Sequence, residues 1–196
     1  MVMFKEQTPK KFVLDTCVGR RCYENPAYSD MLKTKVSDLT GSTTVFTAVS
    51  EYEVNQRAEY GFDKMHSQLE SSIGSEIPIQ EITYDMFQLG VWLRDNIKGL
   101  HHPDNQILAY AMLTDSVLIT CDKGLENAAI YAGHDVINPD RQIVDQTKIK
   151  TVFSRSAQKK VDKLKNKISI PVKAIKKVPD NAVKKSVRKI TWSAFN

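Results

Sequence analysis

The chain of 196 residues lacks several features that would assign it to well-known classes of protein. It contains no run of about 18 apolar residues, so no transmembrane helix is expected. Its first residues lack the apolar stretch and the cleavage site of a secretory signal. Its three cysteines form no CxxC pair, which argues against a disulfide framework and against a zinc site. These absences favour a cytoplasmic protein with free thiols.

Charge is distributed unevenly along the chain, although the net charge is only +5. Residues 1–149 contain 14 Lys and Arg against 21 Asp and Glu, a net charge of −7. Residues 150–196 contain 14 against 2, a net charge of +12. The sequence therefore predicts one domain over residues 1–148 and a basic C-terminal extension over residues 149–196. Such basic segments often contact nucleic acid or another anionic surface.

Short apolar strands alternate with helical patterns over about the first 140 residues. The patterns predict strands at 12–14, 43–49, 77–79, 117–120 and 135–138, and helices at 26–34, 50–61, 62–72, 83–97, 103–112 and 125–132. This alternation is typical of a mostly parallel sheet covered by helices on both faces. Ligands of such sheets bind beyond the carboxyl ends of the strands.

Four acidic residues stand at transitions between these elements. Asp15 and Asp122 each follow a predicted strand, Glu53 follows another within a predicted helix, and Asp104 opens a helix. Divalent metal ions take hard oxygen ligands that distant parts of the chain can supply. The placement of these carboxylates therefore indicates metal-dependent chemistry on phosphates.

Four motifs surround these acids, namely Phe12-Val-Leu-Asp15-Thr16, Val45-Phe-Thr47 with Glu53-Val54, Asp104-x-x-Ile107-x-Ala109-x-Ala111, and Leu118-Ile-Thr120-Cys-Asp122. In order and spacing they resemble the PIN-domain nucleases, and most of all the VapC-type ribonuclease toxins. The resemblance covers residues 11–140. It implies an α/β fold, a PIN-like three-layer domain with a central mostly parallel sheet flanked by helices. A basic extension, helical or partly disordered, follows it.

The resemblance also implies a site and a reaction. Mg²⁺ or Mn²⁺ would be held by Asp15, Glu53, Asp104 and Asp122, with the hydroxyl groups of Thr16 and Thr120 beside them. RNA would be cut by metal-activated water, leaving a 5′-phosphate and a 3′-hydroxyl, without a nucleophilic side chain. A toxin would have a small antitoxin as its partner, and homodimers are common in such families.

The second acid of this set has an alternative in the sequence. Glu51 and Glu53 are two residues apart, so on a helix they point about 200° away from each other and cannot both serve. We prefer Glu53 because an aliphatic residue, Val54, follows it, as is usual for the glutamate of the family.

The basic extension contains two apolar stripes at helical spacing, Val161-Leu164-Ile168 and Val183-Val187-Ile190. They predict two short basic amphipathic helices. We expect their cations to bind RNA phosphates, and the candidates are Lys159, Lys160, Lys163, Lys176, Lys177, Lys184, Lys185 and Arg188. The alternative is a solvated segment whose apolar stripe packs on the domain or on a partner.

Other functions remain to be compared with this hypothesis. A phosphatase of the haloacid dehalogenase type is rejected, because Cys17 stands where that family needs a second Asp. Two alternatives stay open: a catalytically silent PIN-like protein that binds RNA or a partner, and a DNA-directed nuclease of related fold.

Overall fold

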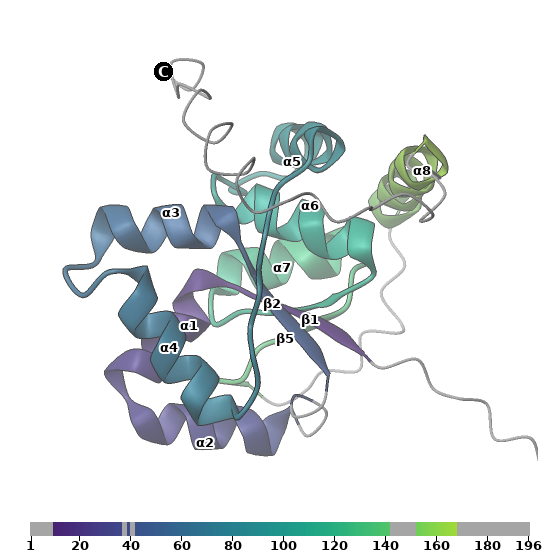
Figure 1. Ribbon diagram of the computed structural model, residues 1–196. Helices are drawn as coiled ribbons and strands as arrows, with labels where there is room; N and C mark the ends of the chain where they lie inside the picture. Colours follow the sequence, from purple (N-terminus) through teal and green to yellow (C-terminus); the bar gives the residue numbers. More distant parts are fainter. Residues whose placement is uncertain (1–9, 37–38, 40–41, 142–151, 168–196) are drawn as a thin grey trace, which may run out of the picture. The chain divides into compact units, whose positions relative to one another are not determined.

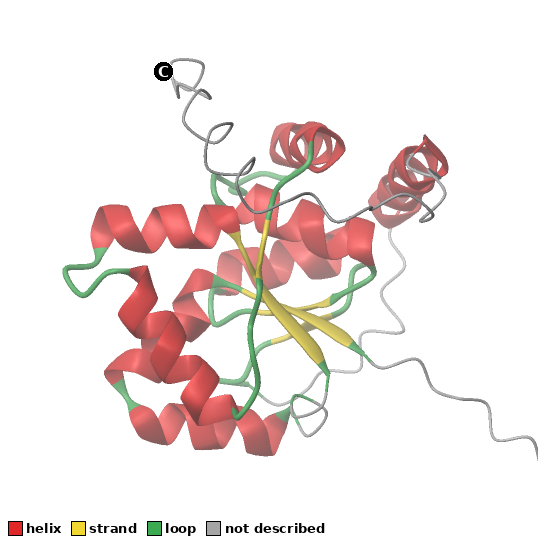
Figure 2. Ribbon diagram, in the orientation of Figure 1, coloured by secondary structure: helices red, strands yellow, loops and turns green. Residues whose placement is uncertain are grey.

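A parallel β-sheet runs through the centre of the protein, as the computed structural model shows (Figure 1, Figure 2). The structure describes residues 10–36, 39, 42–141 and 152–167. Within them the strands are β1 (Lys11–Leu14), β2 (Thr43–Thr47), β3 (Ile79–Gln80), β4 (Val117–Ile119) and β5 (Val136–Ile137). They lie in the order β3-β2-β1-β4-β5, and each adjacent pair is parallel. The carboxyl ends of the strands therefore share one edge of the sheet.

Helices connect the strands and cover both faces of the sheet. Their bounds are α1 (Thr16–Glu24), α2 (Pro26–Lys35), α3 (Ala48–Arg57), α4 (Phe62–Ile73), α5 (Tyr84–Asn96), α6 (Asp104–Thr114), α7 (Lys123–Ala132) and α8 (Val152–Lys167). In the described part of the chain, no helix is long and apolar enough to cross a membrane.

Alternate side chains of the strands enter two separate hydrophobic cores, as expected for a sheet buried on both faces. Phe12 and Leu14 of β1 pack with residues of α1, α2 and α4. Val13, between them, packs in the other core with residues of α5, α6, α7 and α8. The three-layer α/β arrangement predicted from the sequence, with helices on both faces of a parallel sheet, is therefore confirmed.

Helix α1 is the element that the sequence patterns did not predict. It packs tightly, since a Cβ built on Gly19 would lie 2.8 Å from the ring of Phe46 and 2.9 Å from Met65 of α4. Val18 and Cys22 are buried in the same core. Tertiary packing thus holds this helix in spite of a glycine in its interior, which disfavours helix formation.

The predicted bounds of the second strand and its following helix were wrong by a few residues. β2 ends at Thr47, not at Val49, and α3 runs over Ala48–Arg57, not to Gly61. The β-branched Val49 is helical because it packs against the core that contains α5 and α6.

Helix α8 lies in the region predicted as a separate basic extension. The compact unit that contains the sheet extends to Lys165, well past residue 148. Ala157, Val161 and Leu164 of α8 are buried in the hydrophobic core, and Phe153 stacks between Trp92 and Tyr131. A Cβ built on Gly133, where φ is +74°, would lie only 2.5 Å from the Cβ of Ser154. Two of the three apolar residues of the first predicted basic helix, Val161 and Leu164, therefore pack on the domain, and the third, Ile168, lies outside the described residues.

Candidate functional site

Asp15 lies where β1 ends and α1 begins. Its backbone N–H donates to the carbonyl of Ile119 in β4 over 2.9 Å, so two neighbouring strands fix its position. The side chain is only 3% exposed. Its Oδ2 accepts hydrogen bonds from Thr120 Oγ1 at 2.6 Å and from Cys17 Sγ at 2.9 Å. Neutral donors thus orient this carboxylate and leave its charge uncompensated.

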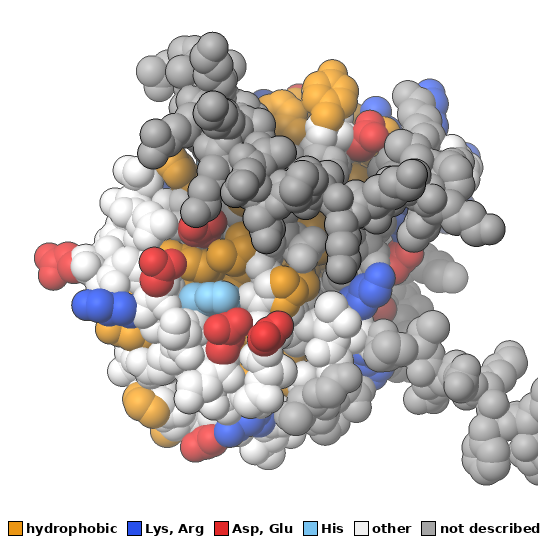
Figure 3. Space-filling view, viewed as in Figure 1, with side chains coloured by type: hydrophobic (Ala, Val, Ile, Leu, Met, Phe, Trp, Pro, Cys, Tyr) orange, Lys and Arg blue, Asp and Glu red, His pale blue; other side chains and the backbone are white. Residues whose placement is uncertain are grey.

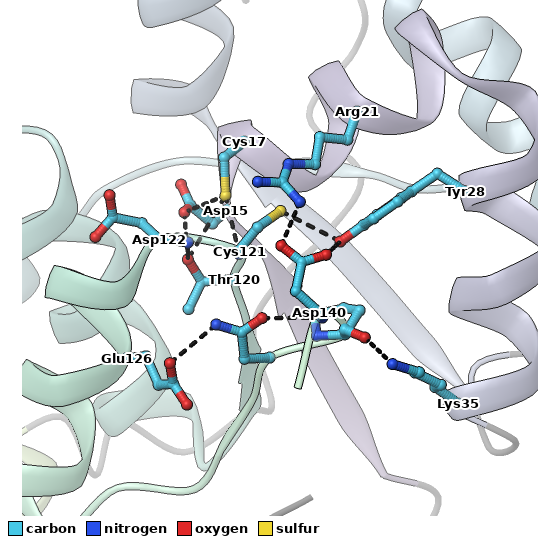
Figure 4. A network of polar contacts seen from close by, with 12 residues as sticks. Asp15, Cys17, Arg21, Tyr28, Lys35, Thr120, Cys121, Asp122, Glu126 and Asp140 are labelled. Carbon is cyan, nitrogen blue, oxygen red and sulfur yellow. Dashed lines mark hydrogen bonds and ion pairs between the residues drawn. The ribbon is translucent and has the colours of Figure 1, made fainter. Parts of the chain in front are cut away.

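Thr120 and Asp122 follow β4 and lie beside Asp15 (Figure 4). Thr120 is fully buried, and its Oγ1 also accepts from the backbone N–H of Asp122 at 2.9 Å. Asp122 is the N-cap of α7, where its Oδ1 accepts from the N–H of Leu125 at 2.8 Å. This cap satisfies a free N–H at the helix N-terminus. The single hydroxyl of Thr120 therefore links two of the four predicted acids.

Glu53 and Asp104 approach the same place from two helices. Asp104 is the first residue of α6 and follows a cis His102–Pro103 peptide bond. Glu53 lies on α3 and forms an ion pair with Arg57, one turn further on, at 2.8 Å. Glu51 is not among the residues that line the pocket formed here, whereas Glu53 is.

Five of the six predicted site residues line one open pocket of about 210 Å³, and the sixth, Thr120, is buried behind it, where it bonds to Asp15. We call this hollow the acidic pocket, and its lining consists of Asp15, Thr16, Cys17, Arg20, Glu53, Arg57, His102, Pro103, Asp104 and Asp122. Figure 3 shows a face of the molecule on which acidic side chains gather around a histidine. Four segments that are distant in the sequence thus contribute carboxylates to one hollow at the carboxyl edge of the sheet.

Two carboxylates of the acidic pocket, those of Asp15 and Asp104, have raised pKa values. The pKa of Asp104 rises to about 7, first because the group is buried and then because Asp15, Asp122 and Glu53 repel its charged form. Burial is also the main reason that the pKa of Asp15 lies well above its usual range. Both shifts mean that the charged pocket is unfavourable without a counter-ion.

The chemistry of the acidic pocket fits a hard divalent cation. Its donors are carboxylate oxygens, which Mg²⁺ and Mn²⁺ prefer, and a cation would relieve the repulsion that raises the pKa of Asp104. In the present side-chain positions, however, no group of three or more His, Cys, Asp or Glu within the described ranges is arranged to hold an ion. The residues thus match a divalent cation in charge and in donor type, but fewer than three of their side chains converge on one position.

Two further side chains in the pocket bear on its chemistry. Thr16 is 3% exposed, and its Oγ1 has no hydrogen-bond partner among the residues that the structure describes. His102 is exposed, and the partial loss of water around its ring is the main reason that its pKa is lowered. A buried hydroxyl and a neutral imidazole can both bond to a water molecule or a phosphate oxygen.

The sequence analysis missed the role of the cysteines. Cys17 was predicted only to be a free thiol, yet it donates to Asp15 and also accepts from the N–H of Cys121 at 3.0 Å. The hydroxyl of Tyr28 in turn donates to Cys121 Sγ at 3.4 Å. The proximity of Cys17 and Cys121 to the two acids was visible in the sequence, but thiols are weak hydrogen-bonding groups and gave no clear signal.

A second polar cluster lies at the same edge of the sheet, beyond β4. Asp140 accepts from Tyr28 at 3.1 Å and pairs with Arg21, and Glu126 pairs with Arg141 at 3.1 Å. Asn138 joins the two acids, because its Nδ2 donates to Glu126 at 2.9 Å and its Oδ1 accepts from the N–H of Asp140 at 3.0 Å. We call these residues the paired network, of which Figure 4 labels Arg21, Tyr28, Glu126 and Asp140. In contrast to Asp15, its acids have cationic partners.

Of the predicted RNA-binding cations, three lie on α8. Lys159 and Lys163 are exposed and Lys160 is partly exposed. The remaining candidates, Lys176, Lys177, Lys184, Lys185 and Arg188, lie outside the described residues, as does the second predicted basic helix. Their contact with nucleic acid stays a prediction.

Comparisons with known proteins identify the fold and no family. No protein-family model and no curated protein matches the chain. Among solved structures, a chain of the FitAB complex bound to an IR36 DNA fragment is similar, with a TM-score of 0.50 and 18% identity over 68% of this chain and 99% of that one.

Two other solved structures are similar at lower TM-scores. A chain of VapBC2 from Rickettsia felis, bound to a DNA fragment from the promoter, gives 0.47 and 16% identity over 65% of this chain and 98% of that one. A chain of FitAcB from Neisseria gonorrhoeae gives 0.45 and 20% identity, over 67% and 99%. At such identities the likeness concerns the fold alone.

Proposed function

We propose that the protein is an endoribonuclease that hydrolyses RNA phosphodiester bonds with Mg²⁺ or Mn²⁺, by metal-activated water. The observation that carries this proposal is the convergence of four carboxylates, from β1, α3, α6 and the turn after β4, in one open pocket. The raised pKa of Asp104 supports it, because buried acids that repel one another are unfavourable unless a ligand uses them.

In this proposal the metal would be held by Asp15, Glu53, Asp104 and Asp122. A bound divalent ion would lower the pKa of the attacking water and offset the charge that develops on the phosphate. Thr120 and Cys17 hold the Asp15 carboxylate in one orientation. Thr16 Oγ1, without a partner among the described residues, offers a hydroxyl to a water molecule or a phosphate oxygen.

We further propose that the protein is the toxin of a toxin–antitoxin pair, with a small antitoxin protein as its partner. The resemblance of its four acidic motifs to VapC-type toxins supports this role. The fold shared with a chain of the FitAB complex is consistent with it.

The test is cleavage of end-labelled RNAs and of single-stranded DNA by the purified full chain, with Mg²⁺, Mn²⁺ or EDTA. We expect metal-dependent cleavage of RNA that is lost in Asp15→Asn and in Asp104→Asn. Cleavage of DNA in preference to RNA would instead favour a DNA-directed nuclease. RNA binding without cleavage under any metal would favour a catalytically silent protein, and cleavage that survives both substitutions would exclude this site.

A further inference from the structure

A second hollow opens beside the acidic pocket, on the side of α3. Its volume is about 240 Å³, and it is lined by Tyr52, Glu53, Gln56, Arg57, His102 and Pro103. Four of these residues also line the acidic pocket, namely Glu53, Arg57, His102 and Pro103. The two hollows are therefore neighbours along one groove, which α3 borders on one side and the turn before α6 on the other.

The lining of this second hollow differs in chemistry from the acidic pocket. It contains one carboxylate, that of Glu53, where the acidic pocket contains four. Tyr52 and Gln56 are one helical turn apart on α3, so their side chains lie on the same side of the helix. They add an aromatic ring and a side-chain amide. Such a surface suits a flat polar group better than it suits a metal ion.

Tyr52 is partly accessible to solvent at this place. The residue is 43% exposed, and it is one of four large hydrophobic residues with such exposure in the described chain. An aromatic ring with an exposed face is a platform on which nucleobases stack, and every base has a face that can stack. Gln56 is also exposed, and its amide can donate to and accept from the edge of a base.

Arg57 lines both hollows and carries a positive charge, which can pair with a phosphate of an RNA backbone. One of its N–H groups donates to Glu53 at 2.8 Å, while its side chain is 66% exposed. A guanidinium group has five N–H donors, so others are available to a phosphate oxygen. His102, shared by both hollows, offers a further ring nitrogen on the opposite wall.

We infer that this second hollow is a nucleobase subsite, in which Tyr52 stacks on a base of single-stranded RNA, Gln56 contacts its edge, and Arg57 contacts a phosphate of the strand. The inference rests on the proposed ribonuclease function, because it places the base next to the phosphate that enters the acidic pocket. A base held at this position gives the enzyme a way to select unpaired RNA, since a base inside a duplex cannot reach the ring of Tyr52.

The experiment compares intact RNA with RNA that lacks bases. Fluorescence anisotropy measures binding of a short labelled single-stranded RNA, and of the same backbone with abasic riboses, to the full-length protein in EDTA. Moderately high salt is used, because it weakens contacts that are made only to phosphates. The variants are Tyr52→Ala, Tyr52→Phe and Gln56→Ala, each checked by circular dichroism and thermal unfolding. Tyr84→Ala is the matched control, because Tyr84 is 75% exposed but lines neither hollow.

We expect Tyr52→Ala to weaken the binding of intact RNA about tenfold, the effect of losing one stacked base. Tyr52→Phe keeps the ring and should bind within about twofold of the wild type, and Tyr84→Ala should change nothing. Gln56→Ala should have a smaller effect that depends on the base sequence. The abasic RNA should bind more weakly to the wild type and should not distinguish it from Tyr52→Ala.

Three results would overturn the inference: wild-type protein that binds intact and abasic RNA equally, Tyr52→Ala that binds intact RNA as well as the wild type does, or an equal loss on both RNAs. A Tyr52 ring that serves a protein partner would give the second result. The outcome is independent of the cleavage assay. Base-dependent binding without any cleavage would refute the nuclease function and support the subsite. Cleavage and RNA binding that are unaffected by Tyr52→Ala, with cleavage lost in Asp104→Asn, would support the nuclease function and refute the subsite.

Discussion

The acidic pocket and the paired network lie along the same edge of the sheet, yet their carboxylates have different surroundings. In the paired network, Asp140 meets Arg21 and Tyr28, and Glu126 meets Arg141 and Asn138. In the acidic pocket, by contrast, Asp15 receives only neutral donors, and the pKa of Asp104 is raised first by burial and then by its acidic neighbours.

This difference separates two uses of a buried acid. A carboxylate with matched partners stabilises the native state, because its hydrogen bonds and ion pairs replace those lost with water. A carboxylate among other carboxylates is destabilising until a cation binds. The acidic pocket and the paired network both contain acids close to strand ends. Only the hydrogen-bond and ion-pair partners of these acids show which of the two regions is suited to bind a ligand.

The comparison would fail most clearly if isosteric substitutions in the two regions had the same effect on catalysis. We expect Asp104→Asn to lower RNA cleavage at least about 100-fold, because even residues that only orient metal ligands cost roughly 10- to 100-fold. Asp140→Asn, the matched change in the paired network, should keep most of the activity. The measurement is the rate of RNA cleavage under single-turnover conditions with Mn²⁺. Equal losses of activity in the two variants would contradict the distinction between the acidic pocket and the paired network.

The residues that position the acidic pocket should show an intermediate effect. Thr120→Val removes the hydroxyl that donates to Asp15 and accepts from the N–H of Asp122. We expect cleavage to fall about tenfold, as for other groups that orient ligands. Thr114→Val is the control, because its hydroxyl bonds to Tyr110 and Ser116 near the end of α6. A cleavage rate that responds equally to both would argue against the positioning role.

The free energy of unfolding, in contrast to the cleavage rate, should depend on the paired network. Glu126→Ala leaves the amide of Asn138 and the guanidinium of Arg141 without their acceptor, which should lower the free energy of unfolding by about 2 kcal/mol. Asp30→Ala removes an acid that is 78% exposed and paired with Lys33, so its effect should stay below about 0.5 kcal/mol. Urea unfolding compares the two, and a Glu126→Ala protein as stable as the wild type would show that the network contributes nothing.

A further effect is expected on the pH dependence of stability without metal. Because the pKa of Asp104 is about 7 in the folded protein, against a usual 3.8, the folded state binds a proton more tightly than the unfolded one. This contribution is fully present below about pH 4 and is lost as the pH rises through about 7.

Urea unfolding in EDTA at several pH values from about 4 to about 8 measures this effect. The wild type should lose stability over this range relative to Asp104→Asn, which cannot titrate at this position. Curves of equal slope would mean that neither burial nor the neighbouring acids raise the pKa of Asp104 in solution.

Much of the fold could be predicted from local patterns. The strand at 12–14 and the helices over 26–34 and 62–72 agree with β1, α2 and α4 to within a residue or so at most ends, because apolar periodicity and end signals such as Pro26 and Gly74 are local. Helix α1 could not be predicted, since its stability depends on the approach of Gly19 to Phe46 and Met65. For α8, the apolar stripe was visible in the sequence, but the burial of Val161 and Leu164 in the core and the stacking of Phe153 on Trp92 and Tyr131 were not.

The sequence by itself determined the alternation of strands and helices, the four acids and their places at element ends. It also determined the excess of positive charge beyond residue 150. These properties follow from residue type and spacing, which act over a few neighbours. Only the tertiary structure decided that Glu53 and not Glu51 lines the acidic pocket, that Cys17 orients Asp15, and that Arg57 lies between two hollows. Those outcomes depend on the crossing of distant segments, because a parallel sheet brings together strand ends that are about 100 residues apart.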